Sequence, residues 1–342
     1  MVTPADVTIV GGGPAGASLA IALGRQGARV VLYEKARFPR LKACGEGLLP
    51  HGVAALEALV GVPAAPRMRG LRFRAGAESA DIDFPSGYGL VLRRDWFDAW
   101  LFERAAATPN VEVRPGTAYR EAPTRWLVAA DGAHSRFHRL LPARPARRRR
   151  VGLSTHVAGF EGVGDRVEVF FHDGGELYVA PAGGGETLVA ALFDYERFRP
   201  DGVAHLLRSI PAVRDRAASV EQTTPVLAAA PLGLHVPRIV DARRRLLLVG
   251  DAAGTPDPIT GDGMALALSS TADAADAILS GTLRRYERRR LARGRKARRL
   301  GRLLLGLSRT ERRAAWFLRD LSGVIPLLLD VALGATPAAP AD

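Results

Sequence analysis

The sequence predicts an α/β protein with two sheets of different kinds, followed by C-terminal helices. A glycine-rich turn joins a β-branched strand to an Ala- and Leu-rich helix at the start of the chain, which is typical of a parallel, Rossmann-like sheet. The segment 151–237 has strand-like stretches separated by glycine turns, which is typical of an antiparallel or mixed sheet. The first pattern returns at Arg245–Val249. We therefore expect a discontinuous first domain that holds a second domain as an insertion.

The length and composition are those of a two-domain globular protein. The chain has 342 residues, of which 47% are hydrophobic, and this is enough for a large core. Its single cysteine, Cys44, excludes an intrachain disulfide and suits a reducing compartment. The first strand begins near Val7, which leaves no room for a signal peptide, and no window holds the roughly 20 apolar residues of a membrane-spanning helix. These observations predict a cytoplasmic protein.

The glycine-rich turn predicts a dinucleotide site. Gly11, Gly13 and Gly16 have the G-x-G-x-x-G spacing, and Pro14 and Ala15 open the helix between them. In this motif the first glycine makes the tight turn, the second lets the backbone approach a pyrophosphate, and the third lets the helix pack on the strand. The helix N-terminus adds N–H donors and a positive dipole.

The second strand adds a candidate ribose ligand. Ala28–Tyr33 is apolar and β-branched, and Glu34 and Lys35 follow it, about 20 residues beyond the glycines. A carboxylate at this position can accept hydrogen bonds from the adenosine ribose hydroxyls. The alternative is that Glu34 only ends a strand at the surface.

The remaining elements follow the same two patterns. In the first domain we expect helices at Ala15–Leu23, at Gly52–Leu59, within Val91–Ala107 and at Met264–Leu279, and strands at Val111–Val113 and Trp126–Ala130. Gly70–Phe84 is expected to form a hairpin in the separate, second sheet. In the second we expect strands at Val167–Phe171, Leu177–Ala180, Thr187–Phe193 and Ala218–Val226 and a helix at Val203–Leu207. The predicted domains are 1–65, 88–142 and 238–282 for the nucleotide-binding part, 66–87 and 151–237 for the sheet part, and 283–342 for the basic C-terminal helices.

Two further strand-to-turn junctions accompany the first one. Asp131-Gly132 follows the strand at Trp126–Ala130, and Gly250-Asp251 follows Arg245–Val249. A loop with the sequence P-I-T-G-D-G follows the last junction and contributes Pro258, Gly261 and Gly263. In this order the three junctions resemble the flavin monooxygenase superfamily of para-hydroxybenzoate hydroxylase type, which includes the geranylgeranyl reductases and the flavin-dependent halogenases. The resemblance covers essentially the whole chain.

The resemblance implies an FAD-dependent oxidoreductase that uses NAD(P)H as co-substrate. It implies that Asp251 binds the ribitol, that the loop from Pro258 to Gly263 lies against the flavin pyrimidine edge, and that Asp131 holds the pyrophosphate region. Arg94 resembles the family arginine that reaches the FAD phosphates. The FAD ligands implied by motif and resemblance together are Gly11, Gly13, Pro14, Ala15, Gly16, Glu34, Lys35, Arg94, Asp131, Gly250, Asp251, Pro258, Gly261 and Gly263.

The loop between Lys42 and Pro50 supplies the candidate catalytic residues. Its Cys44-Gly45 element resembles the geranylgeranyl reductases, in which the cysteine lies close to the isoalloxazine ring. Cys44, Glu46 and the nearby His51 are the candidates, and the alternatives are a small buried thiol, a Lys42–Glu46 ion pair and a solvated histidine. The Trp-x-Trp-x-Ile-Pro segment of tryptophan halogenases is missing, because Leu177–Pro181 stands at the equivalent place.

Three functions follow as hypotheses. The first is hydroxylation of an aromatic or lipophilic molecule through a flavin C4a-hydroperoxide, and the second is reduction of a geranylgeranyl or other alkene. The third, of another class, is a basic binder of nucleic acid or membrane surface, because 284–313 holds 14 Arg or Lys against two acidic residues. The alternative is that this run is a solvated helix face in an Arg-rich protein. A peripheral membrane contact through these helices is a further hypothesis, and a nucleic-acid partner is disfavoured. The seven His and one Cys show no metal-ligand spacing.

Overall fold

A six-stranded sheet forms the centre of the first domain, as the glycine-rich turn predicts. The computed structural model describes residues 5–122, 124–147, 149–173, 175–198, 201–321 and 323. The sheet has the order β18-β19-β9-β1-β2-β8 and is parallel except for β18, which runs antiparallel to β19. Its strands are β1 (Ala5–Val10), β2 (Val30–Glu34), β8 (Val111–Pro115), β9 (Thr124–Ala129), β18 (Val240–Asp241) and β19 (Leu246–Leu248). The predicted Rossmann-like sheet is confirmed.

The helices of this domain pack around the first of them, which contacts β1, β2 and β8. They are α1 (Pro14–Arg25), α2 (Pro50–Val60), α3 (Arg94–Ala106), α6 (Gly263–Ser269) and α7 (Thr271–Ser280). The prediction of one helix over Met264–Leu279 is wrong, because the helix is interrupted at Ser270. The Ser270 hydroxyl donates to the Leu266 carbonyl at 2.7 Å and the Thr271 hydroxyl to the Ala267 carbonyl at 3.3 Å. Side-chain hydrogen bonds of this kind compete with the backbone ladder and bend helices.

The second sheet has eight strands and is mixed, because β12 and β5 pair in parallel while the other neighbours are antiparallel. Its path is β15-β11-β14-β13-β12-β5-β6, with β16 also on β11. The strands are β5 (Gly70–Ala75), β6 (Glu78–Asp83), β11 (Arg150–Ala158), β12 (Arg166–His172), β13 (Gly175–Gly183), β14 (Glu186–Asp194), β15 (Glu221–Gln222) and β16 (Leu227–Ala229). The hairpin predicted at Gly70–Phe84 is therefore part of this sheet.

One predicted strand of this sheet is wrong. Ala218–Val226 contains only the short β15 at Glu221–Gln222, and β16 starts after it. The Val220 N–H donates to the Ala217 carbonyl in a turn before β15. Pro225 then interrupts the ladder, because proline has no N–H to donate.

Smaller elements join the two sheets and cover the second one. The outer face of the second sheet is covered by α4 (Gly202–Ser209) and α5 (Pro211–Arg214), which close a core with Leu153, Phe193 and Leu206. The strands β3 (Gly47–Leu48), β4 (Arg67–Met68) and β7 (Gly89–Val91) form a three-stranded sheet, and β10 (Arg144–Pro145) pairs with β17 (Leu234–His235). Short 3₁₀ turns are η1 (Arg136–Arg139), η2 (Tyr195–Arg197), η3 (Gly250–Ala253) and η4 (Pro258–Thr260).

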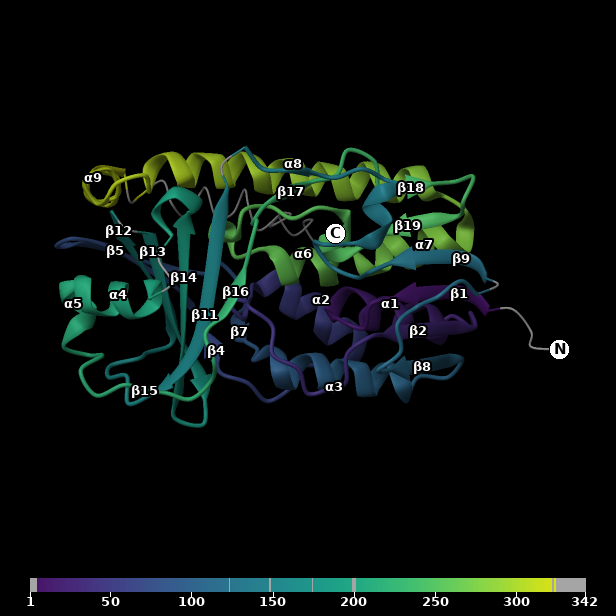
Figure 1. Ribbon diagram of the computed structural model, residues 1–342, viewed down its shortest axis with the longest axis horizontal. Helices are drawn as coiled ribbons and strands as arrows, with labels where there is room; N and C mark the ends of the chain where they lie inside the picture. Colours follow the sequence, from purple (N-terminus) through teal and green to yellow (C-terminus); the bar gives the residue numbers. More distant parts are fainter. Residues whose placement is uncertain are drawn as a thin grey trace, which may run out of the picture.

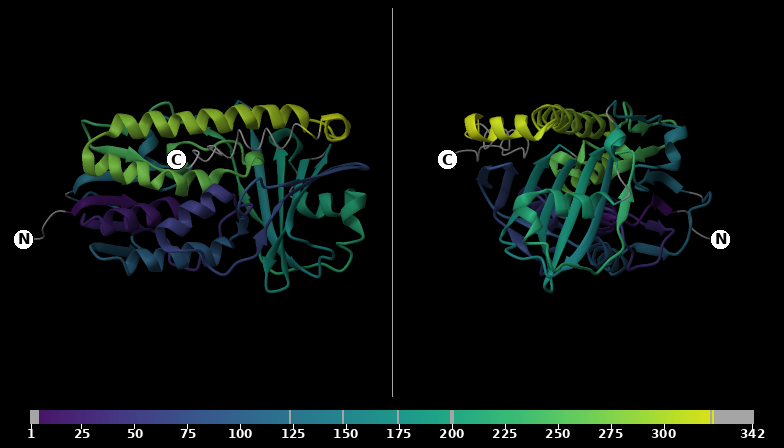
Figure 2. Two further views of the ribbon diagram at one scale, coloured as in Figure 1. Left: turned by 180° about the vertical axis from the view of Figure 1, so that it is seen from behind. Right: turned by 60° about the vertical axis from the view of Figure 1, so that its left-hand side comes forward.

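The C-terminal helices run along one edge of both domains. The 25-residue α8 (Leu283–Leu307) starts beside α7 and β18 and extends to the second sheet, where α9 (Glu311–Leu321) packs on β5 and β6. Figure 1 and the left-hand view of Figure 2 show α8 along this edge. Within the described part of the chain, no helix combines the length and hydropathy needed to cross a bilayer.

Candidate active site

Among the three glycines of the G-x-G-x-x-G motif, only Gly13 has open space beside its Cα atom. A Cβ on Gly11, where φ is +111°, would lie 2.3 Å from the Ala130 carbonyl oxygen, and one on Gly16 would lie 1.9 Å from the Gly11 carbonyl oxygen. Both glycines are therefore needed for close packing. At Gly13 the nearest atom is Nη2 of Arg40, at 3.6 Å. This is the glycine that the motif assigns to pyrophosphate approach.

The Glu34 side chain holds the glycine turn through hydrogen bonds to the backbone. Its Oε2 accepts a hydrogen bond from the Gly12 N–H at 2.8 Å and its Oε1 one from the Ala36 N–H at 2.9 Å. The carboxylate is buried and lies 3.8 Å from Arg40. A carboxylate oxygen has a second lone pair, so these bonds leave Glu34 able to accept from a ribose hydroxyl. Lys35, next in the chain, is exposed.

The sequence prediction missed Arg40, which lies beside the turn. Its Nη2 is 3.1 Å from Oδ2 of Asp98, and its Nε is buried without a hydrogen-bond partner among the described residues. No spacing rule could have selected it, because Arg40 is one of several basic residues in an irregular loop. Its place beside Gly13 makes it a candidate ligand for a phosphate.

Arg94 is buried and fully engaged with a carboxylate. Its Nε and Nη2 donate to the two oxygens of Asp98 at 2.7 and 2.8 Å. Burial by itself would lower the pKa of Arg94, but the Asp98 carboxylate outweighs burial and raises it. The guanidinium also contacts the side chain of Cys44. Its assignment to the FAD phosphates stays a prediction, and in this structure Arg40 lies nearer the glycine turn.

The three strand-to-turn junctions lie against one another. Gly11 packs on the backbone of Ala130 and Asp131, and a Cβ on Gly250 would lie 2.6 Å from the Ala15 Cβ. Asp131 accepts a hydrogen bond from the Arg136 N–H at 3.0 Å through Oδ2, while its Oδ1 is buried with no partner among the described residues. A buried carboxylate oxygen without a donor is costly unless a ligand supplies one.

The loop after the third junction is also open on one side. The Asp257 side chain accepts from the Ile259 N–H at 3.1 Å and so caps η4, and Gly261 takes φ +64°. A Cβ added at Gly261 or Gly263 would meet no heavy atom within 4 Å. The open glycines and the buried Asp131 oxygen fit an elongated cofactor that crosses all three turns, as FAD would.

The Cys44 loop is fixed by contacts to the second sheet and to α3. The Cys44 N–H donates to Oγ of Ser154 at 3.2 Å, and the Glu46 N–H donates to the Cys44 Sγ at 3.3 Å. Glu46 accepts from the Arg94 N–H at 3.0 Å, and its other oxygen lies 2.9 Å from Nε2 of His156. The alternative, an ion pair between Lys42 and Glu46, does not form.

Two contacts of this loop, one to Asp251 and one to His156, were not predicted from the sequence. Nζ of Lys42 is instead 3.9 Å from Oδ2 of Asp251. His156, on β11, is buried with its Nδ1 3.1 Å from Oγ1 of Thr224. It stands 110 residues from Glu46 along the chain, so no local spacing could have paired them.

His51 has a partner next to the open loop. It lies in the first turn of α2, and its Nε2 is 2.9 Å from Oδ1 of Asp262. Its side chain is 25% exposed and that of Asp262 is 13% exposed, so the alternative of a solvated loop histidine does not describe it. An imidazole beside a carboxylate can hold a proton and deliver it.

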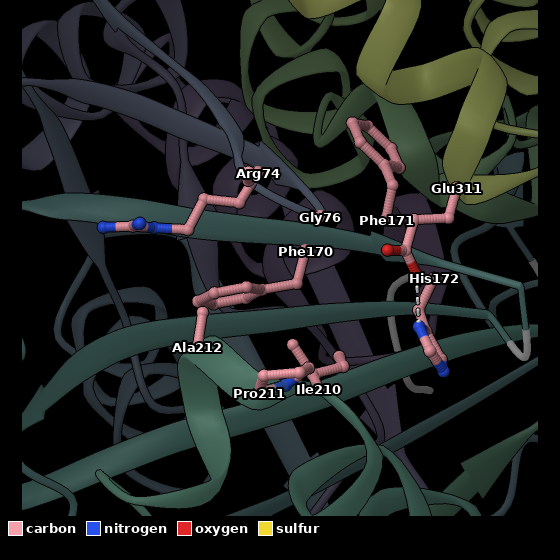
Figure 3. A pocket seen from close by; sticks show the side chains of 10 residues that line it. Arg74, Gly76, Phe170, Phe171, His172, Ile210, Pro211, Ala212 and Glu311 are labelled. Carbon is pink, nitrogen blue, oxygen red and sulfur yellow. Dashed lines mark hydrogen bonds and ion pairs between the residues drawn. The ribbon is translucent and has the colours of Figure 1, made fainter.

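A cavity of about 330 Å³ lies elsewhere, at the far end of the second sheet (Figure 3). It is lined by Arg74, Phe170, Pro211 and a His172–Glu311 pair that is 2.6 Å apart. None of its lining residues belongs to the three turns or to the Cys44 loop. Among the residues that the structure describes, no group of three or more His, Cys, Asp or Glu is placed to hold a metal ion.

A Rossmann-like sheet with three converging turns, joined to a mixed sheet, defines the class of FAD-binding oxidoreductases, and the comparisons with known proteins agree. Residues 4–71 match the family model of an FAD binding domain. The chain is 31% identical to menaquinone reductase of Mycobacterium tuberculosis over 82% of this chain and 78% of that protein. It is 30% identical to digeranylgeranylglycerophospholipid reductase 2 of Methanopyrus kandleri, over 76% and 73%.

The protein belongs to the flavin monooxygenase superfamily of FAD-dependent oxidoreductases, close to the geranylgeranyl reductases. Solved structures agree on the fold. A flavoprotein from Cytophaga hutchinsonii gives a TM-score of 0.82 at 20% identity, covering 97% of this chain and 93% of that one. The flavin-dependent brominase Bmp2 gives 0.80 at 17% identity, covering 96% and 94%. The predicted cofactor, FAD, and the predicted enzyme class are thus supported.

Proposed function

We propose that the protein reduces a carbon–carbon double bond of a lipophilic, isoprenoid-like substrate. The choice of reduction is carried by the Cys44-Gly45 element and the two reductase relatives, and the His51–Asp262 pair beside the open Gly261–Gly263 loop is the proton source that we propose. Reduction of an alkene needs a hydride on one carbon and a proton on the other. FAD, when bound and reduced, supplies the hydride. The second hydrogen arrives as a proton, and we assign its delivery to His51, whose Nε2 is 2.9 Å from the Asp262 carboxylate.

The Cys44 loop provides a rigid wall for the substrate and cofactor. Its position is fixed by Ser154 on one side and by Glu46 on the other, so little motion is left to the thiol. The Cys44-Gly45 element and the two reductase relatives support reduction over hydroxylation. Rigid placement of reacting groups accounts for a large share of catalysis. We assign Cys44 to substrate contact and Glu46 to positioning of the loop.

The reductant that we propose is NAD(P)H. The sequence contains one glycine-rich dinucleotide fingerprint, at Gly11–Gly16, and the three turns assign it to FAD. The nicotinamide nucleotide would then bind only briefly, without a Rossmann sheet of its own. Spectra of the enzyme mixed with NADH or NADPH in an oxygen-free cell test this step, because FAD loses its yellow colour on reduction.

Oxygen dependence separates the two candidate reactions. The purified protein is incubated with NADPH and short polyprenyl substrates under nitrogen and in air. The molecular masses of the products are then measured by mass spectrometry. Reduction predicts a product with two additional hydrogen atoms that forms without oxygen. A product that contains one additional oxygen atom and forms only in air would overturn the proposal.

Hydroxylation is the second candidate, and one observation favours it. The chain is 30% identical to 6-methylpretetramide 4-monooxygenase of Streptomyces rimosus over 82% of this chain and 76% of that enzyme. A proton donor such as His51 would serve this reaction also, since oxygen transfer requires protonation. The same experiment decides between the two.

We expect His51→Gln to slow the chemical step. Glutamine keeps the hydrogen-bonding shape but cannot deliver a proton, so kcat should fall about 10²- to 10⁴-fold. Reduction of the flavin by NADPH should continue at the wild-type rate. Stopped-flow absorbance separates these two half-reactions. A variant that loses both equally would show that His51 acts through cofactor binding.

A further inference from the structure

The outward side of the C-terminal helices carries positive charge that no described residue neutralises. Within 284–313, a set of Arg and Lys side chains is exposed and forms no ion pair within the described ranges: Arg284, Arg285, Arg288, Arg295, Lys296, Arg299, Arg302, Arg309, Arg312 and Arg313. We call this set the basic face. Arg289 and Arg293, on the flank of α8, are paired with Asp273.

The basic face also contains large apolar side chains. Its α8 members are related to one another by steps of three, four or seven residues, so they project from one side of the helix. Leu303, 45% exposed, falls on the same side as Arg299 and Arg302. Trp316, 49% exposed, follows Arg312 and Arg313 on the outer side of α9. Both helices lie on the same edge of the molecule in Figures 1 and 2.

The basic face is held rigidly, because the opposite side of α8 is built into the fold. Arg290 is buried and donates to the Gly254 carbonyl at 2.7 Å and the Gly250 carbonyl at 3.2 Å. Tyr286 donates to the Leu248 carbonyl at 2.9 Å. The helix is therefore fixed to the third FAD turn, and it is not a loosely attached basic tail.

We propose that the basic face docks on an anionic lipid bilayer. Clustered Arg and Lys side chains are attracted to anionic headgroups, and each one near the surface adds to the binding. Leu303 and Trp316 favour the bilayer over nucleic acid, because apolar and indole groups enter the interface between headgroups and acyl chains. The purpose that we infer, access to a substrate dissolved in the membrane, rests on the proposed function; the docking does not.

Sedimentation with lipid vesicles tests the docking. The full chain is mixed with vesicles of phosphatidylcholine alone or with added phosphatidylglycerol, at low and high salt. We expect binding only to the anionic vesicles, and we expect high salt to weaken it. Binding to both vesicle types alike, or to neither, would overturn the proposal.

Two charge-matched variants locate the binding surface. One carries Arg288→Gln, Lys296→Gln, Arg299→Gln and Arg302→Gln. Its control carries Arg120→Gln, Arg125→Gln, Arg208→Gln and Arg214→Gln, which are all exposed and outside the C-terminal helices. The first should bind anionic vesicles at least about tenfold more weakly, while the control binds like the wild type. Circular dichroism and FAD content verify that both are folded. Equal losses in the two variants would contradict the proposal.

Two further measurements separate docking from its rivals. Activity on a short, water-soluble substrate should be the same in both variants and the wild type, so a failed reductase assay does not bear on vesicle binding. A duplex DNA competitor should not release the protein from anionic vesicles. Tighter binding to DNA than to vesicles at the same salt would assign the basic face to nucleic acid instead.

Discussion

The glycines of the first turn have two different roles: two of them allow close packing, and one leaves room for a ligand. Gly11 and Gly16 have no room for a Cβ, whereas Gly13 has an extended backbone, with φ −74°, and space beyond it. A side chain at Gly13 is thus compatible with the fold but would occupy the space where a pyrophosphate approaches. Substitution here separates folding from cofactor binding.

We predict that Gly13→Val abolishes FAD retention while the protein still folds. The stability cost should be about 1 kcal/mol, because valine is a poor residue at a helix N-cap. Absorbance of the purified protein near the flavin bands measures occupancy, and thermal unfolding measures stability. Gly164→Val, at an exposed glycine with no atom within 4 Å of its Cβ position, is the control. Full flavin occupancy in Gly13→Val would contradict the assignment.

Glu46 shows how one residue can be held in a strained conformation. It has φ +54°, in the left-handed region that residues other than glycine seldom adopt. Such strain persists where the surroundings determine it. The Arg94 N–H and His156 hold the Glu46 carboxylate, and its carbonyl accepts from the Leu92 N–H at 2.8 Å. These contacts fix the Cys44 loop.

At the scale of elements, α8 supports the third turn through a buried guanidinium. Burial lowers the pKa of Arg290, and its Nη2 donates to two backbone carbonyls. We predict that Arg290→Met destabilises the fold by on the order of 3 kcal/mol, because both carbonyls lose a charged donor. FAD binding should also weaken.

Urea unfolding and FAD titration measure these two effects. Arg288→Met, at an exposed position of the same helix, is the control and should change the free energy of unfolding by less than about 0.5 kcal/mol. A wild-type FAD affinity in Arg290→Met would show that α8 does not support the turn.

The hairpin of β18 and β19, which leads into the same turn, has a pH-sensitive aspartate. Arg244, through a side-chain hydrogen bond, holds the pKa of Asp241 below its usual value, and the backbone N–H groups of Arg243 and Arg244 add to this. A lowered pKa in the folded state stabilises the protein above the usual value of about 4, and this contribution is lost as the pH falls through the folded-state pKa.

We therefore expect Asp241→Asn to be less stable than the wild type at neutral pH, with a difference that shrinks in acid. Thermal unfolding between about pH 7 and about pH 3 measures it. Asp276→Asn, at an exposed position of α7, should follow the wild-type curve. A constant difference at every pH would mean that Asp241 acts by shape and not by charge.

At the scale of the whole molecule, a largely buried network joins the second sheet, the loop that begins η4 and the C-terminal helix α8. Arg150 on β11 donates to Asp257 and to Glu176, each at 2.7 Å, and Ser308 at the end of α8 donates to Glu176 at 3.1 Å. Asp257 caps the open loop before Gly261. The second sheet thereby sets the position of the loop assigned to the flavin ring.

We predict that Arg150→Met costs about 3–5 kcal/mol of the free energy of unfolding, because Glu176 is left buried without its cation. The double variant Arg150→Met/Glu176→Gln should recover part of this loss, since both charges are then gone. Urea unfolding of the two variants gives the comparison. Equal stability of the single variant and the wild type would show that the network is not energetically important.

The sequence alone determined the central strands of the first sheet and the three turns that follow them, and the family that these turns resemble indicated the cofactor, FAD. Gly11–Gly16, Asp131-Gly132 and Gly250-Asp251 each follow a strand directly, and such signals depend on neighbours in the chain. Because parallel strands end at the same edge, three such junctions predict one convergent site. The Rossmann-like sheet and the mixed sheet could therefore be predicted from local patterns.

Only the tertiary structure decided how the charged residues pair. Glu46 with His156, Arg290 with the Gly250 turn and Arg40 beside Gly13 join segments that are far apart in the chain. Their partners are set by which strand and helix faces are buried together, and a buried polar group must take the partner that packing brings to it. Local spacing carries no record of that packing.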